Sequence, residues 1–220
     1  LGPLVTACCA LAVPDAWTPD SPWTEMEAAF CREWRKGETR AGVSDSKILY
    51  RTGGIAALEL TVGAFARAVD ADAAPGPALA DSGAATRHPC YSGTVEPFPV
   101  HNEPSAVEQA AAAMRGALQR CGAAAAHLEA ALLFEPALNH RFATGLNKNQ
   151  ALLMETGRHL TRLAEKHPGP ILAVVDKQGG RNDYLPFLTA LFPGVWLDVL
   201  EAGAERSRYR LRRPGGAMEI

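Results

Sequence analysis

The sequence predicts an α/β fold in which a mixed sheet is flanked by helices. Apolar, strand-like segments alternate along the chain with longer segments whose apolar residues recur at helical spacing. Near the carboxyl end, "RSRYRLRRPGGAMEI" contains two strand-like runs around a Pro-Gly-Gly turn, which predicts an antiparallel hairpin. Alternation favours parallel strands and the hairpin adds antiparallel ones, so we expect the sheet to be mixed.

Each element is predicted from the periodicity of its apolar residues and from the Pro and Gly residues at its ends. Polar residues 44–51 read as a connector, and residues 70–104 as a Pro/Gly/Ala-rich insert within one domain spanning residues 1–220. The expected strands are 4–13, 128–134, 171–175 and 195–200, followed by the hairpin; the expected helices are 24–36, 55–69, 105–122, 146–167 and 182–191.

Composition indicates an ordinary soluble protein with no obvious partner class. Hydrophobic residues make up 47% and charged residues 21% of the 220 residues, and the formal net charge is −2. Nucleic-acid binding would therefore need a local basic patch. Five cysteines without CxxC spacing favour reduced thiols, and the six scattered histidines suggest no zinc site. No stretch approaches 20 apolar residues, so we expect no membrane span. The reduced thiols favour a cytoplasmic protein, and we expect it to be a monomer.

The most informative position is Asp176, which directly follows the apolar run "ILAVV". A carboxylate at the end of a buried strand is costly unless a metal ion or a basic group compensates it. Ligands of open α/β sheets gather at this end of the strands, and the following Lys177, Gly179, Gly180 and Arg181 are suited to phosphate. The alternative is structural: Asp176 caps the next helix or pairs with Arg181. The segment lacks the P-loop order.

Two other segments are candidates for binding. In "VSDSKILY", Ser46 and Lys47 offer a hydroxyl and an ammonium to a phosphate, or else Ser44 or Asp45 simply caps a helix. In "ERSRYRLRR", the alternation of a strand places arginines on one face about 6.6 Å apart. That face either tracks a nucleic-acid backbone or is a solvated outer face with Tyr209 and Leu211 packed inward. Its arginines are Arg206, Arg208, Arg210 and Arg212.

Three segments taken in order resemble the type 2 ribonucleases H, a family with a ribonuclease H-like fold. "LGPLVTACCALAV" is similar to the apolar strand that follows the family's DEAG-x-G-x-x-x-GP motif. "SDSKILY" resembles its D-S-K-K-L segment, and "LNKNQALLMETGRHL" followed by "ILAVVD" resembles its N-x-L helix and the strand that ends in a catalytic Asp. The order fits across most of the chain apart from the 70–104 insert.

The resemblance implies an endonuclease that hydrolyses the RNA strand of RNA–DNA hybrids with Mg²⁺ or Mn²⁺. Asp176 would be catalytic and a metal ligand, because hard cations prefer oxygen ligands and two such ions assist phosphodiester hydrolysis. The resemblance further implies that Ser46 and Lys47 contact the nucleic-acid backbone. The full set of substrate-binding candidates is Asp45, Ser46, Lys47, Lys177, Gly179, Gly180, Arg181 and Tyr184.

The chain also departs from the family. The family's first acids would precede Leu1 and its last catalytic Asp would follow Ile220, so we expect a fold truncated at both ends and inactive by itself. "DKQGGRNDY" is longer and more basic than the family's D-G ending, which indicates a divergent branch. Two alternatives remain: a non-catalytic nucleic-acid-binding domain of the same fold, or an unrelated α/β enzyme that binds a phosphorylated small molecule.

Overall fold

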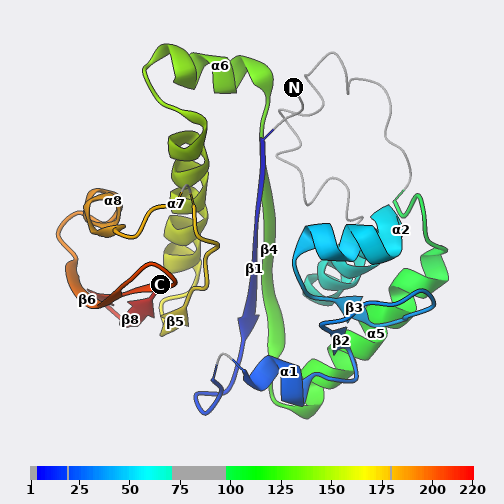
Figure 1. The fold of residues 1–220 in the computed structure, drawn as a ribbon. Helices are drawn as coiled ribbons and strands as arrows, with labels where there is room; N and C mark the ends of the chain where they lie inside the picture. The colour runs from blue at the N-terminus through cyan, green and yellow to red at the C-terminus, as the bar shows by residue number, and fades with distance from the viewer. Residues whose placement is uncertain (1–3, 19, 71–97, 179) are drawn as a thin grey trace. The chain divides into compact units, whose positions relative to one another are not determined.

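A computed structural model describes residues 4–18, 20–70, 98–178 and 180–220, and it shows a mixed α/β protein (Figure 1). The chain divides into two compact units, each described here by itself. We call Ala7–Leu132 the N-terminal unit, and Leu133–Ile220 together with Leu1–Thr6 the C-terminal unit. Most of the 70–104 insert (residues 71–97) lies outside the described residues.

The N-terminal unit contains two small sheets. Strand β1 (Leu4–Ala12) pairs with β4 (Ala124–Leu133), and the two strands run in opposite directions (Figure 1). Strand β2 (Phe30–Cys31) pairs in parallel with β3 (Ala41–Gly42). The strands predicted at 4–13 and 128–134 are thus confirmed, and the second begins four residues earlier than expected.

Two long helices supply the core of this unit. Helix α2 (Ser46–Val69) packs against α5 (Pro104–Arg120). Small and apolar side chains on the facing sides, such as Leu60, Ala64 and Met114, are almost completely buried. Helix α2 is the one described helix that is long and apolar enough, by length and composition alone, to cross a membrane. Core helices of soluble proteins share this length and composition.

Two predictions for the N-terminal unit are wrong. Residues 24–36 are not one helix: α1 (Ser21–Glu25) ends at a turn in which Phe30 N–H donates to Met26 O, and β2 follows. The helical spacing of Met26, Ala29 and Phe30 instead reflects burial in the core. Residues 44–51 are not a connector either, because α2 already begins at Ser46. The helix is interrupted at Gly54, whose φ of 66° is accessible to glycine.

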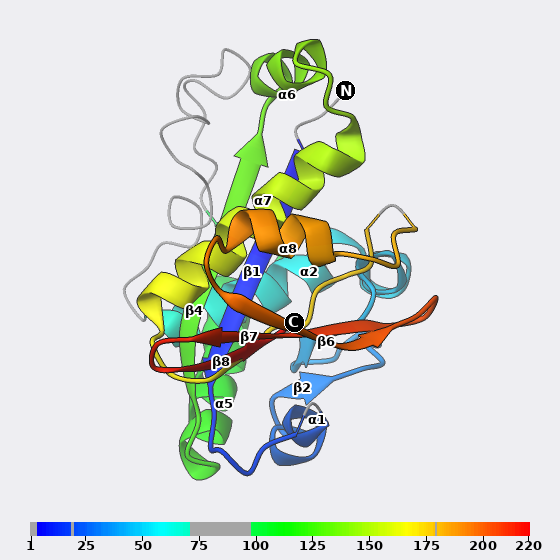
Figure 2. The same ribbon diagram turned by 90° about the vertical axis from the view of Figure 1, so that its left-hand side faces the viewer.

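The C-terminal unit packs three helices with a mixed four-stranded sheet of order β5–β8–β7–β6. Figure 2 shows β6, β7 and β8 of this sheet. Only β5 and β8 are parallel, so the predicted mixed sheet is confirmed. Leu160, Leu211 and Met218 form its core. The elements are α6 (Glu135–Ala143), α7 (Lys148–Lys166), α8 (Leu185–Leu191), β5 (Ile171–Leu172), β6 (Trp196–Ala202), β7 (Ser207–Arg213) and β8 (Gly216–Glu219).

Local signals explain several of these boundaries. Asn147 caps α7 through a reciprocal pair of hydrogen bonds with Gln150, as a capping box does. The turn of the confirmed β7–β8 hairpin needs Gly215, with φ of 88°, because a Cβ there would lie 2.4 Å from Pro168 O. Helix α6 is not among the predicted elements. Pro136 lies in its first helical turn, where the missing N–H of proline costs little.

Candidate functional site

Asp176 lies on an exposed segment rather than at the end of a buried strand. The strand predicted for 171–175 is limited to Ile171 and Leu172, which pair with Met218 and Glu219 of β8. Ala173 N–H still donates to Glu219 O, but the chain then leaves the sheet and Val174 is 86% exposed. The expectation of a buried strand up to residue 175 is therefore wrong, because the pairing with β8 ends at Leu172.

The Asp176 carboxylate has neither of the structural roles that we considered as alternatives. The residue that precedes α8 is Tyr184, and its neighbour Asp183 accepts the Leu185 N–H at 2.9 Å. Arg181 is joined to the loop through its backbone N–H, which donates to Gln178 O. Within the described part of the chain no cation forms an ion pair with Asp176 and no hydrogen bond engages it. It is an exposed carboxylate without a bonded partner among the described residues.

The basic residues after Asp176 are arranged differently from a phosphate-binding loop. Lys177 Nζ donates to Asn182 Oδ1 at 2.8 Å and to the carbonyl oxygen of Ala204, so the ammonium is occupied by the protein's own oxygens. Gly180 is exposed and has a φ of 67°, as a turn requires. Gly179 lies outside the described residues. Lys177, one of the predicted phosphate ligands, thus connects the loop to the β6–β7 turn through hydrogen bonds.

Sequence reasoning missed the residues that hold this loop in place. Gln178 donates through Nε2 to Thr156 Oγ1 of α7 at 2.6 Å. Tyr209 of β7 was expected only to pack inward. Its hydroxyl also accepts a hydrogen bond from the Tyr184 N–H and donates one to Asp183 Oδ1. A long-range contact of this kind has no local sequence signal. Tyr184 was selected as a substrate-binding candidate, and its hydroxyl instead bonds the Gln178 backbone.

The "SDSK" segment forms the beginning of α2 in the N-terminal unit. Asp45 is the N-cap, and its carboxylate accepts from the backbone N–H groups of Lys47 and Ile48 at 2.8 and 3.3 Å. The capping alternative is therefore confirmed for Asp45. The side chains of Ser46 and Lys47 are exposed on the first helical turn. This segment and Asp176 belong to different units.

The arginines of the β7 face form ion pairs with three acids of the neighbouring strands. Arg210 and Arg208 contact Glu219 at 2.6 and 3.3 Å, and Arg212 contacts Asp198 at 2.9 Å. The hydrogen bond from Arg210, followed by that from Arg208, holds the pKa of Glu219 below its ordinary value. Arg206 pairs with Glu201 at 2.8 Å.

The opposite face of β7 is internal. Tyr209 is 2% and Leu211 0% exposed, as one of the two alternatives for this segment predicted. Together with the ion pairs on the outer face, this burial favours a solvated, salt-bridged surface over a row of cations available to phosphates.

The described residues do not by themselves complete a metal site. No three His, Cys, Asp or Glu side chains come together within the described ranges. A carboxylate is a suitable ligand for Mg²⁺ or Mn²⁺. One carboxylate alone does not supply the six oxygen ligands that Mg²⁺ prefers. The expected role of Asp176 as a metal ligand stays a prediction.

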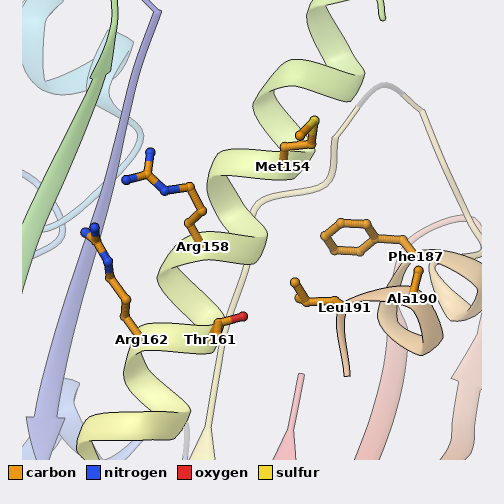
Figure 3. A pocket seen from close by; sticks show the side chains of 7 residues that line it. All are labelled: Met154, Arg158, Thr161, Arg162, Phe187, Ala190 and Leu191. Atoms are coloured by element: carbon orange, nitrogen blue, oxygen red, sulfur yellow. The ribbon is translucent and has the colours of Figure 1, made fainter. Parts of the chain in front are cut away.

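An apolar groove of about 560 Å³ lies between α7 and α8 (Figure 3). Gly157 lets the two helices approach, since a Cβ there would lie 3.0 Å from the Phe187 ring. Figure 3 shows Arg158 and Arg162 extending from α7 away from Phe187 and Leu191. None of the predicted site residues lines the groove, whose walls are Met154, Arg158, Thr161, Arg162, Phe187, Ala190 and Leu191.

Comparison of the chain with protein-family models, with curated proteins and with solved structures finds no match.

Proposed function

We propose that the protein carrying this chain is an endonuclease of the type 2 ribonuclease H kind, built on a ribonuclease H-like fold, that hydrolyses the RNA strand of RNA–DNA hybrids. The observation that carries the proposal is Asp176. It is an exposed carboxylate without a described structural partner, placed directly after the segment that leaves β5. A reactive acid must be accessible to solvent and substrate, and the Asp176 carboxylate is exposed.

The order of the local structures supports the same proposal. The apolar segment at the amino end forms β1, "SDSK" begins α2, and "LNKNQ" caps and begins α7. The chain then enters β5 and reaches Asp176. The order of these elements is the order that the resemblance implies, although β5 ends at Leu172 and not at Asp176.

In this proposal, Asp176 contributes one carboxylate to a site for Mg²⁺ or Mn²⁺. When bound, such ions assist the attack of water on a phosphodiester. Ser46 and Lys47, whose side chains are exposed at the start of α2, contact the nucleic-acid backbone. A cation at a phosphate displaces condensed counterions, so binding through Lys47 weakens as salt is raised. Lys177 does not take this role, because its ammonium is held within the loop.

Both alternative functions have less support. A silent nucleic-acid-binding domain was favoured by the arginine face, and those arginines pair with Glu219, Asp198 and Glu201. A phosphate-binding enzyme was favoured by "DKQGGR", and the lysine of that segment is bonded to Asn182 and Ala204.

The direct experiment incubates the full-length protein with an RNA–DNA hybrid whose RNA strand is labelled. We expect Mg²⁺- or Mn²⁺-dependent cleavage of the RNA strand, loss of cleavage with a chelator, and none on duplex DNA. A protein that leaves the hybrid intact at every metal concentration, while a control ribonuclease H cuts it, contradicts the proposal.

A further inference from the structure

A chain of hydrogen bonds connects the core of the four-stranded sheet to the segment carrying Asp176. It begins at Tyr209, in the centre of β7, whose side chain is buried beside Leu211. The Tyr209 hydroxyl accepts the Tyr184 N–H at 2.9 Å and donates to Asp183 Oδ1 at 3.4 Å. A rigid strand therefore fixes the backbone of Tyr184 at the start of α8.

The second tyrosine continues the connection toward Asp176. The Tyr184 hydroxyl accepts the Gln178 N–H at 2.9 Å and donates to Gln178 O at 3.4 Å. One phenol thus holds both polar backbone groups of a residue that lies two positions after Asp176. Removal of this hydroxyl would leave the Gln178 N–H to find another partner, while Gln178 O would keep only the Arg181 N–H.

Other contacts tie the same loop from its sides. Ser207 Oγ donates to Asn182 O at 2.6 Å, and Gln178 Nε2 reaches Thr156 of α7. The amide oxygen Oε1 of Gln178 is buried without a donor among the described residues, which is unfavourable. The loop is therefore held in its conformation by the remaining bonds even though one of its polar atoms is unsatisfied.

We propose that Tyr209 and Tyr184 are positioning residues, which brace the 176–184 loop so that the Asp176 carboxylate is held in a fixed place for the reaction. This inference rests on the proposed function and deepens it. Neither tyrosine touches substrate in this role. The brace matters because a displacement of about 1 Å in a reacting group can reduce a rate by about 100-fold.

The experiment uses Tyr184→Phe in the full-length protein, with Tyr50→Phe as the matched control because Tyr50 is exposed. Limited trypsin digestion reports the loop directly, since Lys177 and Arg181 are both potential cleavage sites within it. We expect Tyr184→Phe to speed cleavage at these two sites about tenfold or more. Tyr50→Phe should leave the rate at the wild-type value. Tyr209→Phe should act in the same direction.

The second readout is hybrid cleavage, resolved into kcat and KM. We expect Tyr184→Phe to lower kcat about tenfold with an unchanged KM, because the hybrid does not contact the brace. Unaltered tryptic protection and unaltered kcat in Tyr184→Phe and Tyr209→Phe would overturn the inference, even if wild-type protein cleaves hybrids. A wild-type protein that does not cleave hybrids overturns the proposed function instead, and the tryptic experiment then still decides whether the tyrosines brace the loop.

Discussion

The Arg210 guanidinium donates two hydrogen bonds to the same oxygen of Glu219, at 2.9 Å from Nε and 2.6 Å from Nη2. The bonds cross from β7 to β8, and Arg208 reaches the other oxygen of the same carboxylate. A single carboxylate thus forms ion pairs with two of the arginines that the sequence places on one face. The surface presents ion pairs rather than free cations.

Glu219→Gln should release both arginines and raise the affinity for nucleic acid. At low salt we expect the Kd for an RNA–DNA hybrid to fall about two- to fivefold, because each freed guanidinium can neutralise a phosphate. Glu205→Gln is the matched control, since Glu205 is exposed and its substitution removes the same formal charge. Equal Kd values for the two variants would show that Glu219 does not mask the arginines.

The Glu38–Arg40 pair should make stability depend on pH in the acid range. A two-pronged hydrogen bond from Arg40 to Glu38, opposed by burial, lowers the pKa of Glu38 from 4.5 to about 2. Because the folded pKa is depressed, the stabilisation is complete above pH 4.5 and is lost as the pH falls toward 2. Arg40 is 40% exposed, so solvent screening limits the effect to about 1 kcal/mol.

Chemical denaturation of wild type and Glu38→Gln at several pH values measures this effect. The difference in unfolding free energy between the two proteins should be largest near pH 7 and should shrink between pH 4.5 and 2. Comparison with the variant removes the contribution of other acids. A difference that stays constant over this range would contradict the assignment.

Gly53 and Gly116 should respond in opposite ways to substitution by Ala. A Cβ on Gly53 would lie 2.3 Å from a ring carbon of Trp34, so Gly53→Ala should destabilise the protein by roughly 1–3 kcal/mol. At Gly116 in α5, the nearest atom is the end of the Arg120 side chain at 3.4 Å. Gly116→Ala should therefore stabilise by about 0.5–1 kcal/mol through helix propensity. Thermal melting of both variants tests the packing of Trp34 against α2.

Glu59 should be a structural acid whose removal is costly. Its buried carboxylate accepts the N–H groups of Val100 and His101 and the Asn102 amide, the last at 2.7 Å. Burial raises its pKa, but these hydrogen bonds outweigh burial and lower it overall. Glu59→Ala should cost roughly 2–4 kcal/mol because several donors lose their acceptor. Denaturant unfolding should show no comparable loss for Glu103→Ala, an exposed control.

Local signals predicted the elements that depend on local physics. The capping residue Asn147, the apolar spacing after it and Pro168 placed α7 to within two residues of its observed bounds. Alternation and the Pro-Gly-Gly turn predicted the β7–β8 hairpin and the inward side chains Tyr209 and Leu211. In each case the residue pattern within one segment is sufficient to predict whether that segment forms a helix or a strand.

The remaining features depend on contacts that no single segment contains. Met26 and Phe30 are spaced as in a helix, yet the chain turns between them because Phe30 joins a strand that pairs with β3. The strand after Ile171 is short because β8 accompanies it only to Leu172. The partners of Lys177 and the arginines of β7 likewise come from other segments, so the sequence identified these cations without revealing that they are occupied.

The central claim is that the Asp176 carboxylate takes part in hydrolysis, and Asp176→Asn tests it most directly. The substitution keeps the shape of an exposed side chain that has no described partner, so the melting temperature should not change. In the full-length protein, the initial rate of hybrid cleavage should fall at least about 100-fold, while Glu205→Gln keeps the wild-type rate. A fully folded Asp176→Asn variant that cleaves the hybrid as fast as wild type would contradict the account.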